Sequence, residues 1–304
     1  MPQKSSRRTR GLDADDREFE SFERMSAVRM DEDYSDNSDG LPEGDRWSTW
    51  DQSEPLERGP QPWPDWLITD LGAVDTELGV LKTGKEADVF LLRRGLPQDG
   101  PSCLLAAKRY RSSEHRMFHR DAGYLEGRSV LDSRVNRAMA NRTAFGRRAI
   151  AGQWAAAEFQ TLRELWTAGL PVPYPVQIVG TEILMEFLGE PDGVAAPRLA
   201  QLRSEDADLT DLFGQAAEAM VRLARGRLAH GDLSPYNLMV HRHRLMIIDL
   251  PQVVDVIANP HGARFLARDA TNVSRWFAGR GVTDPLCSPA ALTDLLLAEA
   301  GLRG

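Results

Sequence analysis

The sequence predicts an α+β fold in which a small β-rich lobe precedes a mostly helical lobe. Two apolar runs, at residues 78–82 and 87–93, flank a four-residue turn in a pattern typical of a β-hairpin, and a third run follows at 104–110. From about residue 150 onward the apolar residues recur mainly at helical spacing. A length of 304 residues is enough for such a pair of lobes to bury a sizeable core.

The later elements follow in a clear order. A helix is expected from about Ile150 to Gly169, because Ala155, Phe159 and Leu162 lie on one helical face. Next come short strands at 177–179 and 183–187, a helix at 212–224, a hairpin at 238–240 and 245–249, and a helical remainder. We expect the β-rich lobe to span residues 61–187 and the helical lobe to span residues 188–304.

The net charge of −8 is concentrated near the N-terminus. Residues 1–60 contain 9 basic and 16 acidic residues, and they include an acidic stretch rich in Ser and Gly that is too polar to build a core. We expect residues 1–60 to form a disordered tail whose removal leaves the thermal stability of the core nearly unchanged. Four tryptophans are expected to pack where the tail meets the fold: Trp47, Trp50, Trp63 and Trp66.

Residues 109–149 contain 10 arginines and 4 acidic residues, with little apolar periodicity. We expect a mobile basic segment, suited either to contact with RNA phosphate or to a solvated insert. The charge of the whole chain does not indicate a nucleic-acid binder. Two cysteines argue against a disulfide framework, and no apolar run approaches the roughly 20 residues of a membrane span. A cytoplasmic protein without a membrane segment is therefore expected.

The loop before the predicted hairpin carries the most informative residues. Asp232 is followed by Asn237 five residues later, and Asp249 ends a buried strand 12 residues beyond Asn237. The carboxylate of Asp249 and the amide oxygen of Asn237 are ligands that Mg²⁺ prefers. Asp232 is left to take or orient the proton of an attacking hydroxyl. The joint spacing predicts a magnesium–phosphate site rather than three unrelated turn residues.

A lysine and a glutamate are expected to complete this site. Lys108 ends an apolar strand, and Glu158 lies on the apolar face of the first predicted helix. A buried carboxylate is costly unless it is paired. A Lys108–Glu158 ion pair meets that need and holds the lysine against the phosphates of a nucleotide; the alternative is two unrelated surface charges.

Residues 79–85 also match the G-x-x-x-x-G-K pattern of a P-loop. That loop requires Ser or Thr at the next position and then a helix, whereas Glu86 follows here and residues 87–91 are typical of a strand. We therefore reject a P-loop. We expect a hairpin turn, Thr83-Gly84-Lys85-Glu86, that lies over the phosphates of ATP, with Gly84 allowing a close backbone approach.

Together these motifs resemble the RIO group of atypical protein kinases, most closely its first branch. The resemblance rests on the turn at 83–87, Lys108, Glu158 after Trp154, the hinge at 185–189, the loop from His230 to Asn237 and a late helix at 265–273. It covers about two-thirds of the chain, from Leu78 to Phe277. The chain departs from conventional kinases at Gly231, where they have Arg, and from the family at Pro251, where relatives usually have Ser.

The resemblance implies a reduced bilobal protein-kinase-like fold without a full activation segment. It implies ATP and Mg²⁺, or Mn²⁺ in its place, and phosphorylation of Ser or Thr in a protein substrate or in the chain itself. Asp232 and Asp249 would be catalytic, with Asn237 and Asp249 as metal ligands. The residues expected to contact the nucleotide are Thr83, Gly84, Lys85, Lys108, Glu158, and the hinge backbone at the C=O of Glu186 and the N–H of Leu188.

Two other functions stay open at this point. RIO relatives act in maturation of the small ribosomal subunit, so an ATPase-driven assembly factor, with Asp249 forming an aspartyl phosphate, is one alternative. A small-molecule phosphotransferase of the aminoglycoside or choline type shares the pattern around Asp232. The short segment after Asp249 and the turn at 83–87 argue against that second alternative.

Overall fold

The structure is a computed structural model that describes residues 44–111 and 144–302, with only the backbone given for residues 144–149. The chain divides into two units, residues 1–40 and 41–304, and the fold below belongs to the second. No described helix has both the length and the apolarity needed to cross a membrane.

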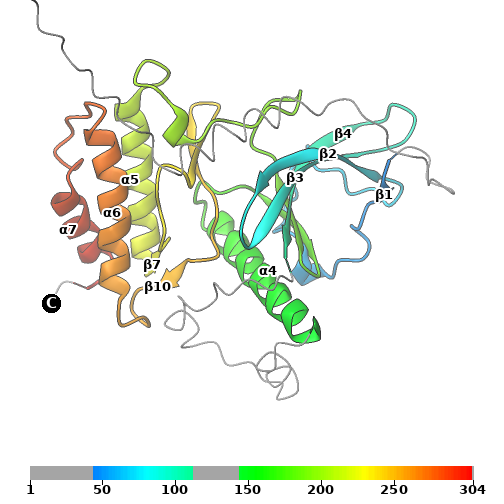
Figure 1. The fold of residues 1–304 in the computed structure, drawn as a ribbon, viewed down its shortest axis with the longest axis horizontal. Helices are drawn as coiled ribbons and strands as arrows, with labels where there is room; N and C mark the ends of the chain where they lie inside the picture. The colour runs from blue at the N-terminus through cyan, green and yellow to red at the C-terminus, as the bar shows by residue number, and fades with distance from the viewer. Residues whose placement is uncertain (1–43, 112–143, 303–304) are drawn as a thin grey trace, which may run out of the picture. The chain divides into compact units, whose positions relative to one another are not determined.

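A six-stranded antiparallel sheet forms the first part of the fold, in the order β1-β2-β3-β4-β6-β5 (Figure 1). Its strands are β1 (Arg46–Trp47), β2 (Val74–Thr83), β3 (Ala87–Gly95), β4 (Ser102–Tyr110), β5 (Pro175–Val179) and β6 (Glu182–Glu186). The long helix α4 (Ala144–Thr167) packs against β4, β5 and β6. The predicted strands therefore form, each within a few residues of its expected bounds.

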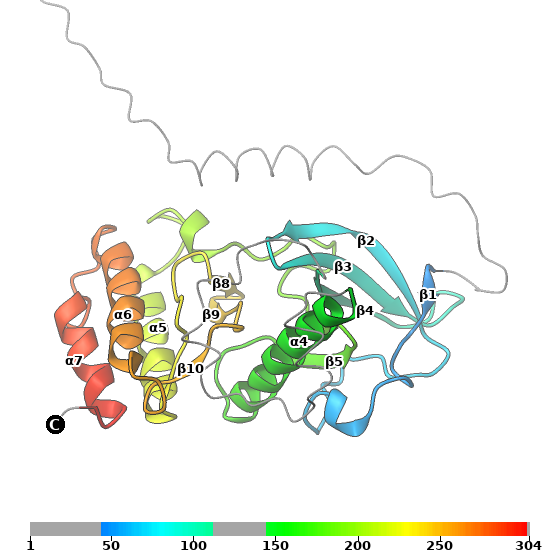
Figure 2. The ribbon, with the colours of Figure 1, turned by 60° about the horizontal axis from the view of Figure 1, so that its bottom comes forward.

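The second part of the fold is mainly helical. Helices α5 (Leu209–Arg225), α6 (Gly262–Ala278) and α7 (Pro289–Glu299) pack against one another, as Figures 1 and 2 both show. Two small β-ribbons complete it: β8 (Leu238–His241) pairs with β9 (Arg244–Ile247), and β7 (Leu228–Ala229) pairs with β10 (Val254–Asp255). The predicted order, strands first and helices later, is confirmed.

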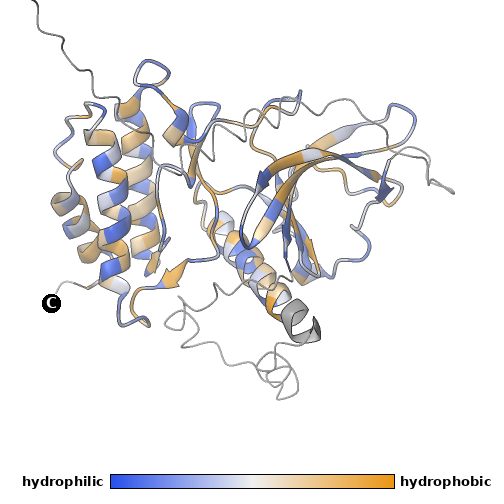
Figure 3. Ribbon diagram, in the orientation of Figure 1, coloured by the Kyte–Doolittle hydropathy of each residue, from blue (hydrophilic) through white to orange (hydrophobic). Residues whose placement is uncertain are grey.

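Each face of the sheet has its own apolar core. On one face, Leu92, Leu105 and Leu184 pack with Trp50 from the N-terminal segment. The other face packs with α4 and is continuous with the core of the helical part. Figure 3 shows mixed apolar and polar residues along α5 and α6, which is the pattern of helices that bury one side only.

The N-terminal boundary differs from the sequence-based prediction. Residues 44–60, assigned to the tail, belong to the fold: they form β1 and the short 3₁₀ helix η1 (Pro55–Glu57), and Trp50 is only 4% exposed. Trp63 packs edge-on against Trp50, as expected, and Trp66, although 37% exposed, lies edge-on to Tyr174, whereas Trp47 is exposed. The acidic composition of this segment did not predict its place in the fold, because a few buried aromatic residues and backbone hydrogen bonds are enough to dock it. Residues 1–43 lie outside the described part of the chain.

The basic segment is also shorter at both ends than predicted. Arg109 and Tyr110 complete β4, and α4 begins at Ala144, six residues before the expected start at Ile150. Arg109 is held in the sheet by Glu77 and Glu182, with both N–O distances 2.6 Å. Residues 112–143 lie outside the described part, so the contact with RNA stays a prediction.

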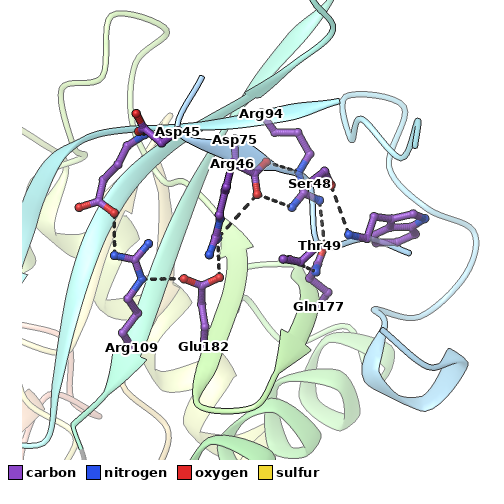
Figure 4. A network of polar contacts seen from close by, with 11 residues as sticks. Asp45, Arg46, Ser48, Thr49, Asp75, Arg94, Arg109, Gln177 and Glu182 are labelled. Carbon is purple, nitrogen blue, oxygen red and sulfur yellow. Dashed lines mark hydrogen bonds and ion pairs between the residues drawn. The ribbon is translucent and has the colours of Figure 1, made fainter. Parts of the chain in front are cut away.

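A polar network ties the N-terminal segment to the sheet (Figure 4). Fully buried Arg94 donates to both carboxylate oxygens of Asp75, at 2.7 and 3.0 Å, and to Oε1 of Gln177 at 2.8 Å. Nη2 of Arg46 in β1 lies 2.5 Å from Oε1 of Glu182 in β6. The network links strands that are not neighbours in the sheet, and it supports the strand that carries Lys108.

Candidate active site

Lys108 joins the sheet to the helical part of the fold. Its Nζ lies 2.7 Å from Oε1 of Glu158 on α4 and 3.0 Å from Oδ1 of Asp249, two residues after β9. The expected Lys108–Glu158 pair therefore forms, and the side chains at 108 and 249 meet in one place. Strand alternation points Lys108 toward α4, and the apolar face of α4 carries Glu158 inward, where it is only 2% exposed.

The charges of this cluster support one another. Burial opposes ionisation of both Lys108 and Asp249, but their mutual attraction outweighs it. Beside Glu158 and Asp249 the pKa of Lys108 lies above its ordinary value, and the Lys108 ammonium helps lower the pKa of Asp249 to about 2. Asp249 is therefore a carboxylate at neutral pH. It also has a positive φ of 65°, a conformation that a non-glycine residue adopts only when its surroundings hold it there.

Glu158 has two further partners that sequence reasoning missed. The hydroxyl of Tyr110 donates to Oε2 of Glu158, and the backbone N–H of Leu250 donates to Oε1 at 3.3 Å. Tyr110 lies two residues after Lys108, so both side chains leave the same face of β4. That two-residue spacing could have predicted from the sequence that Tyr110 lies beside Glu158. The bond from Leu250 depends on the path of the chain after Asp249, and no sequence pattern indicates it.

Asn237 is positioned so that its amide oxygen is left for a ligand. Its side-chain Nδ2 donates to the backbone carbonyl of Asp232 at 2.9 Å. The backbone carbonyl of Asn237 accepts from the N–H of Ile248 at 3.0 Å. The second bond places Asn237 directly beside the strand end that carries Asp249. A carboxylate and an amide oxygen next to each other suit a hard cation that is also coordinated by phosphate and water. The residues present therefore fit Mg²⁺.

Asp232 lies at the open side of this group. Its side chain is 54% exposed, and Oδ1 is 4.0 Å from Nη2 of Arg268. Partial desolvation raises the pKa of Asp232 above its ordinary value, although nearby Arg268 opposes the change. An accessible carboxylate in this position can receive the proton of an approaching hydroxyl.

Two buried residues, Asp269 and His230, hold the loop that carries Asp232 in place. Asp269 on α6 accepts from the backbone N–H groups of Gly231 and Leu233, both at 2.9 Å. His230 accepts from the N–H of Asp232 at Nδ1, so Nε2 carries the proton and donates to the carbonyl of Ile248 at 3.1 Å. Through these contacts His230 braces the loop against the chain at Ile248. The motif at 265–273 contained Asp269, but its role became visible only in three dimensions.

The turn and the hinge each have backbone hydrogen bonds of their own. Gly84 bonds to Ala87 across the turn at 3.0 Å, while Thr83 and Lys85 are exposed. At the hinge, the N–H of Glu186 donates to Tyr174, and the carbonyl of Leu188 accepts from Ala196. Among the described residues, no hydrogen bond or ion pair connects Thr83, Gly84, Lys85 or the hinge to Lys108, Glu158 or Asp249. Their roles toward a nucleotide stay predictions.

Comparison with known proteins assigns the family. A family model described as the RIO domain matches residues 103–289. The RIO-type serine/threonine-protein kinase Rio1 of Haloferax volcanii is 35% identical over 216 residues, which cover 71% of this chain and 67% of that protein. The chain belongs to the RIO family.

Other similar proteins are also named as RIO kinases, and they are longer than this chain. The serine/threonine-protein kinase RIO3 of Bos taurus is 30% identical over 73% of this chain, and RIO1 of Caenorhabditis elegans is 32% identical over 72%. The chain spans 42% and 40% of those two proteins. Among solved structures, the Rio2 kinase-ADP/Mg²⁺-phosphoaspartate complex from Chaetomium thermophilum matches with a TM-score of 0.48 and 21% identity, over 75% of this chain and 67% of that one.

The departure from conventional kinases at Gly231 and the departure from the RIO family at Pro251 both have structural explanations. Gly231 has a φ of 83°, and a Cβ there would lie 2.4 Å from the carbonyl oxygen of Gln252, so the position requires glycine. Pro251 is buried, and the turn around it is closed by a bond from the N–H of Val253 to the carbonyl of Leu250. The proline is therefore compatible with a RIO active site in which Leu250 contacts Glu158.

Proposed function

We propose that this RIO-family chain transfers the terminal phosphoryl group of ATP to a Ser or Thr hydroxyl of a protein, its own chain included. The observation that supports this most strongly is the position of Lys108, which is held between Glu158 of α4 and Asp249 of the helical part. An ammonium fixed in this way can bind nucleotide phosphates without first being reoriented, which is the main requirement for phosphoryl transfer.

The nucleotide is proposed to lie between the turn at 83–86 and the charged cluster. Lys108 would contact the phosphates, while the turn would add the backbone of Gly84 and the charge of Lys85. At the hinge, the N–H of buried Leu188 has no hydrogen-bond partner among the described residues, and an adenine ring would supply one. The C=O of Glu186 is the proposed second adenine contact.

Asn237 and Asp249 are proposed to hold Mg²⁺, or Mn²⁺ in its place, on the phosphate oxygens. A bound divalent cation neutralises charge on the transferred group. Asp232 orients the attacking hydroxyl and accepts its proton. Its exposure and raised pKa suit a base that meets a substrate entering from outside.

Incubation with γ-labelled ATP, alone and with cell extract, tests the proposal when the labelled residue is identified. We expect acid-stable label on Ser or Thr. Label that is removed by hydroxylamine and maps to Asp249 would instead support the ATPase alternative with an aspartyl phosphate. Absence of any transfer, together with absence of nucleotide binding, would contradict both.

A further inference from the structure

A second lysine faces the same space as Lys108. Lys82 of β2 lies opposite Val89 of β3, and Val89 lies opposite Lys108 of β4. Directly opposed residues of antiparallel strands point to the same face of a sheet. Lys82 therefore shares the face that meets Glu158 and Asp249, with its backbone two strands, or roughly 10 Å, from that of Lys108.

The ammonium of Lys82 is partly desolvated and has no partner in the described part of the chain. It is half-buried, and it forms neither an ion pair nor a hydrogen bond there. Burial lowers its pKa, and the nearby positive charges of Arg198 and Lys108 lower it further, against weaker support from Asp249 and Glu158. A partly desolvated cation that has no directly paired anion is costly in the free protein. Such a cost is explained if an anion binds there.

Arg198 belongs to the helical part of the fold. It forms a β-bridge with Met239, and the N–H of Val240 bonds to the carbonyl of Pro197 at 2.9 Å, so its backbone runs beside β8 just after Asn237. Arg198 is half-buried and forms no ion pair with any described residue. Burial lowers its pKa, and the charge of Asp249 opposes that change, which places its guanidinium within electrostatic reach of the proposed metal site.

We propose that Lys82 and Arg198 bind the terminal phosphate of ATP from two sides, beside Asp249. Glu158 and Asp249 already offset the charge of Lys108, so these two cations add to the positive charge that Lys85 and the divalent cation bring to the triphosphate. The terminal phosphate is assigned because Lys82 precedes the turn at 83–86 and Arg198 lies by Asn237, at the end of the site where Asp232 meets the acceptor. The inference rests on the proposed function and names two positioning residues for it.

Binding of the β,γ-imido analogue of ATP and of ADP, each with Mg²⁺, tests this proposal by calorimetry on the full chain. Lys82→Met and Arg198→Gln should each weaken the analogue at least about tenfold, as expected for a lost charge-assisted hydrogen bond, and ADP less than about threefold. Lys82→Arg should retain most of the affinity for the analogue. Arg203→Gln removes one exposed charge five residues after Arg198 and should leave both affinities unchanged.

Equal weakening of both nucleotides, or of neither, would contradict the assignment to the terminal phosphate. The melting temperature of the nucleotide-free Lys82→Met protein should be unchanged or higher, because an unpaired desolvated charge is removed; a lower value would show a structural role and overturn the proposal. Wild-type protein that binds neither nucleotide would refute the proposed kinase function as well. The two failures are therefore distinguishable.

Discussion

At the scale of single residues, Glu158 is the centre of the site. Its carboxylate is 2% exposed and accepts from Lys108, from Tyr110 and from the backbone of Leu250. A buried carboxylate is tolerated only when several donors replace the lost water. Burial and the charge of Glu158 both raise the pKa of Tyr110, so its hydroxyl remains a donor throughout the working pH range.

Tyr110→Phe removes one of these donors and tests its importance. We expect the free energy of unfolding to fall by about 1–3 kcal/mol, because a buried charged acceptor loses a hydrogen bond. Chemical denaturation measures the change. Tyr236→Phe is the control: Tyr236 is 47% exposed, and its replacement should leave stability nearly unchanged. Equal stability of the two variants would contradict the role of Tyr110.

Asp232→Asn separates binding from chemistry at the same scale. The side chain is on the open side of the site, so nucleotide affinity should be retained, while turnover should fall by roughly 10²-fold or more through loss of the positioned base. Steady-state phosphorylation rates and nucleotide titrations measure the two effects. Unchanged turnover would remove Asp232 from the proposed mechanism.

At the scale of elements, residues 44–60 act as a strap across one face of the sheet. Trp50 fills the core on that face, and Nη2 of Arg58 donates to the carbonyl of Trp50 at 2.8 Å. The N–H of Gly59 bonds to Val176 of β5 at 2.9 Å. These bonds close a turn within residues 44–60 and connect that turn to β5, the strand at the edge of the sheet opposite β1.

Truncation of the chain tests how much this strap contributes to the stability of the fold. A chain that begins at residue 61 should melt at least about 6 °C below one that begins at residue 44, because loss of a buried tryptophan alone costs about 3–5 kcal/mol. Thermal denaturation of the two proteins checks this. This expectation replaces the sequence-based one that residues 1–60 are dispensable; equal melting temperatures would restore the original expectation.

At the scale of the whole fold, the sheet and the helical part meet at Lys108, Glu158 and Asp249. A ligand that contacts both parts binds the folded state and not the unfolded chain, so it must raise the melting temperature. The two sides supply different groups to the proposed site: Lys82, Lys108 and the turn come from the sheet, whereas Arg198, the proposed metal ligands and the proposed base come from the helical part. Neither part alone contains the site.

Asp249→Ala tests this coupling through the cation. In the wild-type protein, ATP with Mg²⁺ at a hundredfold excess over its Kd should stabilise the fold by about 2.7 kcal/mol relative to the nucleotide-free protein. ATP alone should raise the melting temperature less. The variant should lose the part of the shift that depends on Mg²⁺. Its nucleotide-free form must still melt cooperatively, and a magnesium-dependent shift equal to that of the wild-type protein would refute Asp249 as a ligand.

Local patterns in the sequence were sufficient for the order of elements, for the turn at 83–86 and for the pairing of Lys108 with Glu158. These features depend on strand alternation, helical spacing and the cost of an unpaired buried charge. Each of these can be judged from the residues of a single predicted strand or helix. The tertiary structure decided the docking of residues 44–60, the bond from Leu250 to Glu158, and the placement of Lys82 and Arg198 near Asp249. Those depend on strand register and on chain segments far apart in sequence, so they arise only when the whole fold closes.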